Sequence, residues 1–321
     1  AGLAQSLAQD DRERALADEA LAIAERLQKP LVISAALDAR STLLAALLRF
    51  REAAEADERR MSLIRRIPSR EEQMDICAAT ARTRTLLGDY AGAVAAADLA
   101  DELVAGGDQR WVAWPARTRI EAYYYWDRWD DAMEAHERFL EVFRRGQRHR
   151  YVNVPGLVGA VAAAIHLLRG QPEQADIIEQ RVGRVPPQFE LIVAHALLGS
   201  GDPELAIERA SRVPFSRVWV QAITAEAQAA LGRWDDLDGT LTRLDAMHGI
   251  DQLPRAVAQI DRARGIAGDE LALARAEREF ERLGCRFEQA RCLELMGRAE
   301  EARGVYELLG AEPALGRCAP R

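Results

Sequence analysis

Apolar residues recur through most of this 321-residue chain at the spacing of amphipathic helices, and short turns containing glycine or proline interrupt them. The pattern predicts the first three helices at residues 10–28, 31–48 and 51–67. Asp10 is the expected N-cap of the first helix, and Pro30 and Pro68 mark the ends of the first and third. Ser69 opens the next helix, because Glu72 stands three residues later as in a capping box.

The predicted turns share one sequence frame: a turn residue, then Asp or Arg, an aromatic residue or Pro, two further residues and a small residue. Its clearest copy runs from Asp127-Arg128-Trp129 to Ala132. The residue that ends each copy, called the anchor below, stands at Ala53, Ala93, Ala132, Ala175, Ala206, Leu237 and Ala302. A frame that recurs about every 30 to 43 residues over most of a chain predicts stacked two-helix repeats.

A second mark lies twelve positions before each anchor, on the preceding helix. The residues found there are Ser41, Ala81, Ile120, Ala163, Ala194, Ala225 and Ala290. All but Ile120 are small, as expected where the two helices of one repeat approach most closely. Because both marks keep the same phase, the sequence favours an all-α superhelix of helix pairs.

The period and the Gly-Asp-Tyr-x-x-Ala turn at Gly88 to Ala93 resemble the tetratricopeptide repeat. The resemblance implies one solenoid domain over residues 1–313, with about eight helix pairs in a chain of this length. Anchors are 40 and 39 residues apart before the long loop at 146–156 and 31 apart after it, so we expect the curvature to change there. No turn sets a clear register between Ala258 and Leu283. Residues 314–321 are expected to be a frayed tail.

The composition favours a helical protein and argues against nucleic-acid-binding, membrane-spanning and secreted proteins. A hydrophobic fraction of 49%, mainly Ala and Leu, is typical of helices, and a net charge of −8 with pI near 5.4 argues against direct binding to nucleic acid. Neither a membrane-spanning run nor a secretion signal is visible, so we expect a soluble cytoplasmic chain. The four cysteines lack metal-ligand spacing, which favours reduced thiols. The start at Ala1, without an initiator Met, indicates a fragment of a longer protein.

Motifs for catalysis are missing from the sequence. It contains no phosphate loop, no dinucleotide-binding Gly-x-Gly-x-x-Gly after a strand, no His-Glu-x-x-His and no Gly-x-Ser-x-Gly. Acidic pairs such as Asp130-Asp131 fall in the first turn of a helix, where negative charge offsets the helix dipole. We therefore expect a protein that is not an enzyme and needs no cofactor or metal. An enzyme with an unrecognised site is the residual hypothesis.

In tetratricopeptide repeats the first helix of each pair lines the concave wall, and this resemblance implies a partner-binding groove. Counting from the anchors places eleven residues there: Arg82, Thr85, Trp114, Arg117, Glu121, Tyr124, Tyr125, Gln188, His195, Trp219 and Glu226. Tyr, Trp and Arg dominate binding energy at interfaces. Trp129, at the aromatic position of the turn, is expected in the core.

Two readings stay open from the residues alone. Tyr124, Tyr125 and Trp126 either fill the core or face the groove, but consecutive residues of a helix point about 100° apart, so all three are not expected in one place. The basic segment containing Arg144, Arg145, Arg148, His149 and Arg150 is either a set of cations at a helix C-terminus or an anion site.

The stretch from Phe280 to Ala302 resembles the closing repeat of large bacterial signalling ATPases, namely LuxR-type regulators and nucleotide-cyclase-linked ATPases. The resemblance implies a sensor or regulatory domain of such a protein. We expect a non-catalytic scaffold that binds a protein, a peptide or a neighbouring domain of the same polypeptide in its groove. The alternative is a small-molecule effector in the aromatic central groove.

Overall fold

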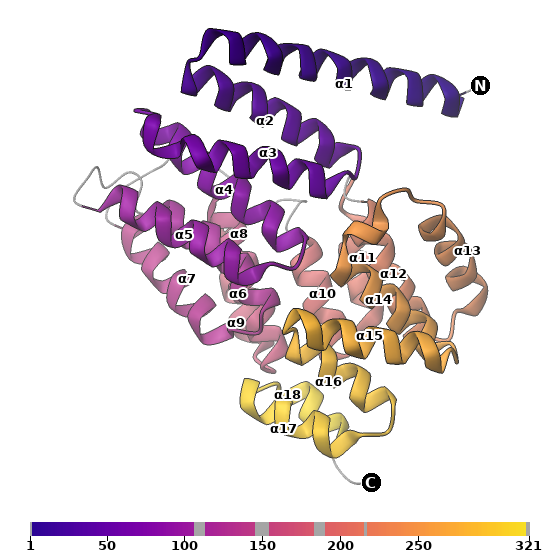
Figure 1. Ribbon diagram of the computed structural model, residues 1–321. Coiled ribbons are helices and arrows are strands. Elements are labelled where there is room, and N and C mark those ends of the chain that lie inside the picture. Colours follow the sequence, from indigo (N-terminus) through magenta and orange to yellow (C-terminus); the bar gives the residue numbers. More distant parts are fainter. Residues whose placement is uncertain (1, 106–112, 145–153, 183–189, 215–216, 319–321) are drawn as a thin grey trace.

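The computed structural model describes residues 2–105, 113–144, 154–182, 190–214 and 217–318, and these residues form an all-α fold (Figure 1). Short 3₁₀ helices at Ile64–Arg66 and Ile250–Gln252 accompany the α-helices. The α-helices are α1 (Gly2–Leu27), α2 (Pro30–Ala46), α3 (Phe50–Leu63), α4 (Arg70–Leu86), α5 (Tyr90–Val104), α6 (Ala113–Tyr125), α7 (Trp129–Arg144), α8 (Val154–Leu168), α9 (Pro172–Val182), α10 (Glu190–Ser200), α11 (Pro203–Ser211), α12 (Arg217–Ala230), α13 (Trp234–Asp245), α14 (Pro254–Ile266), α15 (Glu270–Leu283), α16 (Arg286–Leu295), α17 (Ala299–Leu309) and α18 (Glu312–Arg317).

The helices pack as antiparallel pairs in chain order, from α2 with α3 to α16 with α17. This arrangement confirms the tetratricopeptide-like fold with eight pairs, to which α1 adds a helix before the first pair and α18 one after the last. Figure 1 shows successive pairs turning about a common axis, so that α14 to α16 come back beside the lower ends of α4 and α6.

The register predicted from the two marks is confirmed. Every anchor from Ala53 to Ala302 is at most 3% exposed, and so is every residue twelve positions before an anchor. Trp129 is 2% exposed and lies against Phe287, with ring centroids 5.3 Å apart. The small residues thus lie at the helix crossings, where a larger side chain would hold the two axes apart.

The turn frame has a local physical cause. Gly88 adopts φ of +81°, a left-handed conformation that glycine enters without steric cost, and it ends the first helix of its pair. Asp89 then accepts a hydrogen bond from the backbone N–H of Gly92 at 2.9 Å and caps the second helix. Ser69 caps α4 in the same way through the N–H of Glu72, as predicted.

Three predictions about the chain are wrong. Helix α1 begins at Gly2, so Asp10 is not its N-cap, and Pro30 begins α2 at the position where a missing N–H costs nothing. The expected frayed tail is helical to Arg317, because Ala314 is buried and the carbonyl of Cys318 accepts a hydrogen bond from Arg303 Nη2 at 2.6 Å.

The third error concerns the pair α14 and α15, which is regular. Its turn is Gly268-Asp269, and Asp269 caps α15 through the N–H of Ala272 at 2.9 Å. Counting as in the other repeats places the anchor at Leu273 and the residue twelve positions earlier at Asp261. Neither residue is small, so the pattern of small residues concealed this repeat.

Contacts between distant repeats close the superhelix. A Cβ added at Gly88 would clash with Leu283 Cδ2, which shows how closely the turn of the second pair approaches α15. Asp127, at the turn of the third pair, accepts a hydrogen bond from the N–H of Phe287 at 2.8 Å. Because the N-cap residue of α16, Cys285, makes no side-chain cap, the Asp127 carboxylate caps that helix from another repeat. The change of curvature expected near 146–156 stays a prediction, since most of that segment lies outside the described residues.

Candidate binding cavity

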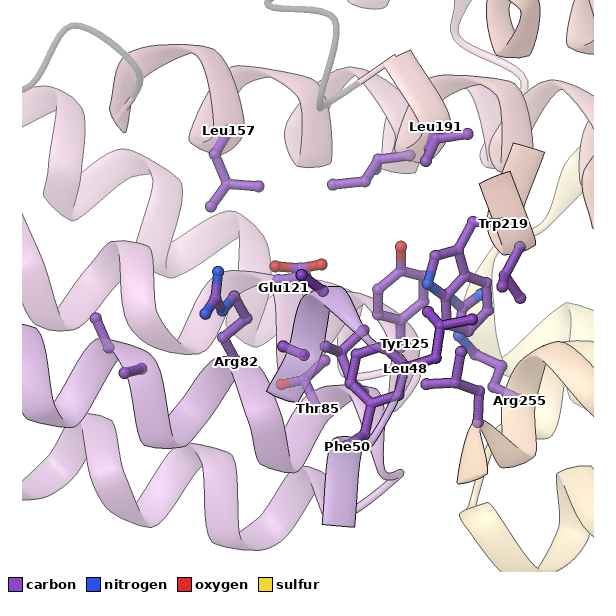
Figure 2. Close-up of a pocket in the computed structure, with 18 of the residues that line it drawn as sticks. Leu48, Phe50, Arg82, Thr85, Glu121, Tyr125, Leu157, Leu191, Trp219 and Arg255 are labelled. Atoms are coloured by element: carbon purple, nitrogen blue, oxygen red, sulfur yellow. The ribbon is translucent and has the colours of Figure 1, made fainter. Parts of the chain in front are cut away.

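A cavity of about 1270 Å³ opens on the inner side of the superhelix (Figure 2). Most of its wall comes from the first helices of seven consecutive pairs, α2, α4, α6, α8, α10, α12 and α14. Among the described residues, the second helices of the pairs contribute one, Phe50 of α3. The repeat architecture therefore brings to one surface side chains from Asp38 to Gln259, which lie far apart along the chain.

Seven of the eleven predicted groove residues line this cavity: Arg82, Thr85, Arg117, Glu121, Tyr125, His195 and Trp219. Figure 2 shows Arg82 and Glu121 to the left of Tyr125 and Trp219. Leu157 and Leu191 face them across the opening. The part these seven residues take in binding a partner stays a prediction.

Two of the predicted groove residues belong to the core instead. Tyr124 is 2% exposed, because it packs toward α10, where its hydroxyl lies 3.0 Å from His195 Nδ1. Glu226 is fully buried and pairs with Arg262, because α12 at that position packs against α14 rather than facing the cavity. The three consecutive aromatics differ in burial: Tyr124 is in the core, Tyr125 lines the cavity and Trp126 is half-buried near Gly284. The rings of Tyr124 and Tyr125 nevertheless stay in contact, with centroids 4.9 Å apart.

The remaining predictions fall on residues that the structure does not describe. Gln188 and residues 145–150 of the basic segment lie outside the described ranges, and so do the side chains of Trp114 and Arg144. Both readings of the basic segment stay open.

An aromatic end of the cavity surrounds Arg255, which sequence reasoning missed. Its guanidinium carbon lies 3.7 Å from the ring centroid of Tyr125 and 4.2 Å from that of Trp219. Arg255 stands eighteen positions before the anchor Leu273, just as Trp219 stands eighteen before Leu237. The Gly268-Asp269 turn would have revealed this position, had it been accepted as a repeat turn without small residues.

The centre of the cavity carries mixed charge. Burial raises the pKa of Glu121, while the positive charges of Arg255, Arg82 and Arg117 act in the opposite direction. At the N-terminal end, Asp38 and Asp75 each accept a hydrogen bond from the buried Arg60, at 2.6 and 2.8 Å. The cavity therefore offers an acidic end, a mixed centre and an aromatic end with one cation.

Behind the aromatic end lies a buried ionic network. Arg262 donates to both carboxylate oxygens of Glu226 at 2.9 Å and lies 2.5 Å from Glu288 Oε2. Arg291 lies 2.6 Å from Glu226 and 3.2 Å from Glu288, so each carboxylate meets both guanidinium groups. Glu288 Oε1 also lies 3.1 Å from His195 Nε2.

Burial and the neighbouring charges together set the direction in which the pKa values of Glu288 and His195 shift. Burial alone would raise the pKa of Glu288, but Arg262, His195 and Arg291 outweigh it and hold that pKa well below its usual range. Burial lowers the pKa of His195, although Glu288 acts in the opposite direction. If His195 is neutral and carries its proton on Nε2, its Nδ1 accepts a hydrogen bond from the hydroxyl of Tyr124.

The fold of this chain is similar to that of a protein of known structure. The protein is similar to the crystal structure of Rap protein complexed with Competence and Sporulation Factor, with 13% sequence identity, a TM-score of 0.57 and 99% of each chain covered. At this identity the similarity shows a shared all-helical, tetratricopeptide-like fold. No family model matches the sequence, and a search of curated proteins finds no match.

None of the described helices is both long and apolar enough to cross a membrane. No group of three or more His, Cys, Asp or Glu side chains in the described part of the chain is arranged to hold a metal ion.

Proposed function

We propose that this chain is a regulatory interaction scaffold without catalytic activity of its own, and that its cavity binds an extended peptide segment. The cavity carries this proposal: its volume of about 1270 Å³ exceeds the roughly 300–1,000 Å³ of small-ligand pockets. The segment belongs to a partner protein or to a neighbouring domain of the same polypeptide. The Rap protein, which shares the fold, was solved in complex with Competence and Sporulation Factor, and this supports a partner-binding role for the present chain.

The wall of the cavity suggests how binding would act on the fold. Residues as distant as Asp38 on α2 and Arg255 on α14 face the same space. A segment that contacts both ends stabilises the closed superhelix over any more open arrangement, because its contacts exist only when both ends are in place. That difference in affinity is what a regulatory domain needs.

We further propose that the chain is the sensor domain of a larger cytoplasmic signalling or transcription-regulating ATPase. The support is the resemblance of Phe280 to Ala302 to the closing repeat of such proteins. All four cysteines are free and buried, which is compatible with a reducing compartment.

A display experiment tests the peptide proposal. Random peptides are selected on the parent chain and their affinities measured on two variants, Ala79→Trp and Ala95→Trp. Ala79 lines the cavity, so its replacement fills the binding space, whereas Ala95 is exposed on α5 and serves as the matched control. We expect selected peptides to lose affinity at least about tenfold on Ala79→Trp and to keep it on Ala95→Trp. Equal affinity for both variants would place binding outside the cavity.

A small-molecule effector is the alternative, and the stack of Tyr125, Arg255 and Trp219 favours it, since aromatic walls with one polar group are typical of small-ligand sites. The two proposals differ in the length of ligand required. Under the alternative, single amino-acid derivatives bind as tightly as the selected peptides. Under the peptide proposal, affinity falls when residues are removed from either end.

A further inference from the structure

Arg255 carries a buried charge that forms no ion pair with a carboxylate of the described residues. It is 9% exposed, and the aromatic faces of Tyr125 and Trp219 cover it from two sides. No Asp or Glu in the described part of the chain lies within 4.0 Å of its guanidinium. Burial acts to lower the pKa of Arg255, but the groups around it, Tyr125 first and the more distant Glu288 among them, outweigh burial and raise that pKa. Glu121 also interacts with Arg255 at longer range. Taking a cation out of water without an anionic partner is costly, and such groups are normally paired.

Gln259 lies one helical turn after Arg255 on α14 and also borders the cavity. It is 1% exposed, yet neither its amide oxygen nor its amide nitrogen has a hydrogen-bond partner among the described residues. Buried amides without partners are rare in folded proteins, and each one invites an explanation. Two buried polar groups at i and i+4 therefore share one unsatisfied face of the cavity wall.

The surroundings of this face are apolar. Leu48, Phe50 and Leu253 line the same end of the cavity, and Figure 2 shows Leu48 and Phe50 beside Tyr125 and Arg255. Leu253 is also the N-cap residue of α14, so no side chain caps the positive end of that helix. The helix dipole thus adds to the charge of Arg255.

We propose that Arg255 and Gln259 form a carboxylate-binding subsite whose ligand carries an apolar side chain next to its carboxylate. The guanidinium supplies a planar pair of donors matched to a carboxylate, and the Gln259 amide supplies a further donor and an acceptor for the adjoining amide group. Leu48, Phe50 and Leu253 accommodate the apolar group. The inference rests on the proposed function. It specifies that the aromatic end of the cavity binds a carboxylate, either the C-terminal one of the peptide or that of an acidic side chain.

Three fluorescein-labelled tetrapeptides test the subsite by fluorescence anisotropy. The first has three alanines and a C-terminal phenylalanine with a free carboxylate. The second is the same peptide amidated at its C-terminus. The third is also amidated but has glutamate at its second position. We expect the first or the third to bind at least about tenfold more tightly than the second, and the tighter of the two shows whether the carboxylate is terminal or from a side chain.

The variant Arg255→Met removes the charge and keeps much of the side-chain volume. We expect it to abolish the preference for a carboxylate while binding the amidated peptide as the parent does. Gln259→Leu should weaken all three peptides by a smaller factor. The thermal midpoint of Arg255→Met should equal or exceed that of the parent, because an unpaired buried charge has been removed. A lower midpoint would mean that Arg255 has a structural role.

The outcomes separate the subsite from the proposed function. Equal binding of all three peptides, unchanged in Arg255→Met but lost in Ala79→Trp, overturns the carboxylate subsite and leaves the peptide cavity standing. Binding that also survives in Ala79→Trp overturns the cavity proposal. No binding of any of the three peptides to the parent chain overturns the subsite for ligands of this class, whereas the display selection continues to test the cavity.

Discussion

Two buried arginines on α14, seven positions apart, lie in opposite electrostatic settings. Arg262 is fully buried and held by Glu226 and Glu288 at 2.5 to 2.9 Å, whereas Arg255 lies between two aromatic rings with no carboxylate within reach among the described residues. Both are desolvated, but only Arg262 forms direct ion pairs with carboxylates of the described residues. These ion pairs make Arg262 part of the closed fold, whereas the proposed carboxylate subsite would supply the direct partner that Arg255 does not have there.

The repeat register explains why these settings differ. Arg262 stands eleven positions before its anchor, and so do Glu121, His195 and Glu226 in earlier repeats. In the middle of the array this position faces the cavity, as at Glu121. Toward the C-terminal end the superhelix brings the same position of adjacent repeats together, and Glu226 and Arg262 neutralise each other. Equivalent positions therefore line the cavity in one part of the molecule and hold repeats together in another.

The largest effect is expected for Arg262→Met, which leaves the buried Glu226 and Glu288 with too little positive charge. We expect a loss of about 3–5 kcal/mol of unfolding free energy, measured by denaturant melts beside Arg255→Met as the matched variant on the same helix. Losses of unfolding free energy of similar size in both variants would show that the two arginines do not differ in their contribution to stability.

The network depends on the register of α10 and α12, which large residues at Ala194 and Ala225 should disturb. Both side chains are fully buried at helix crossings. Ala194→Trp and Ala225→Trp should each cost more than about 2 kcal/mol, the upper range for overpacking a close contact. If both variants melt within about 2 °C of the parent, the register assigned to these repeats is wrong.

Asp127 tests how strongly the distant cap contributes to closure. Asp127→Ala leaves the buried N–H of Phe287 without its acceptor, so we expect a loss of about 1–2 kcal/mol in the same melts. Asp131→Ala, at an exposed ion pair of the next helix, is the control and should change stability much less. A stable Asp127→Ala variant would show that packing alone closes the superhelix.

The smallest effect is a pH dependence from His195. Its pKa is lowered in the folded chain by burial, so the unfolded chain takes up a proton first as pH falls below about 6.5. Stability should therefore decrease from about pH 6.5 down to the folded pKa, by at most about 1.4 kcal/mol per pH unit for one proton. His195→Gln should flatten this part of the curve. An unchanged slope would exclude His195 as its source.

The sequence by itself determined the helix pairs, their register and most of the cavity wall. These follow from local causes: a Gly-Asp turn specifies its own conformation and cap, and small residues mark the crossing of two neighbouring helices. Seven of the eleven predicted groove residues line the cavity for this reason. The sequence pattern did not predict the pair α14 and α15, because Asp261 and Leu273 stand at the two positions where the pattern expects small residues.

Only the tertiary structure decided which equivalent positions face the cavity and which face one another. The contact of Asp127 with Phe287 joins residues 160 positions apart, and no local pattern encodes it. It arises from the sum of small rotations between successive repeats, which sets the pitch of the superhelix. The same rotations placed Tyr124 and Glu226 in the core and left Arg255 without an ion pair to a carboxylate of the described residues, because the pairing of a buried charge depends on which side chains the distant repeats place beside it.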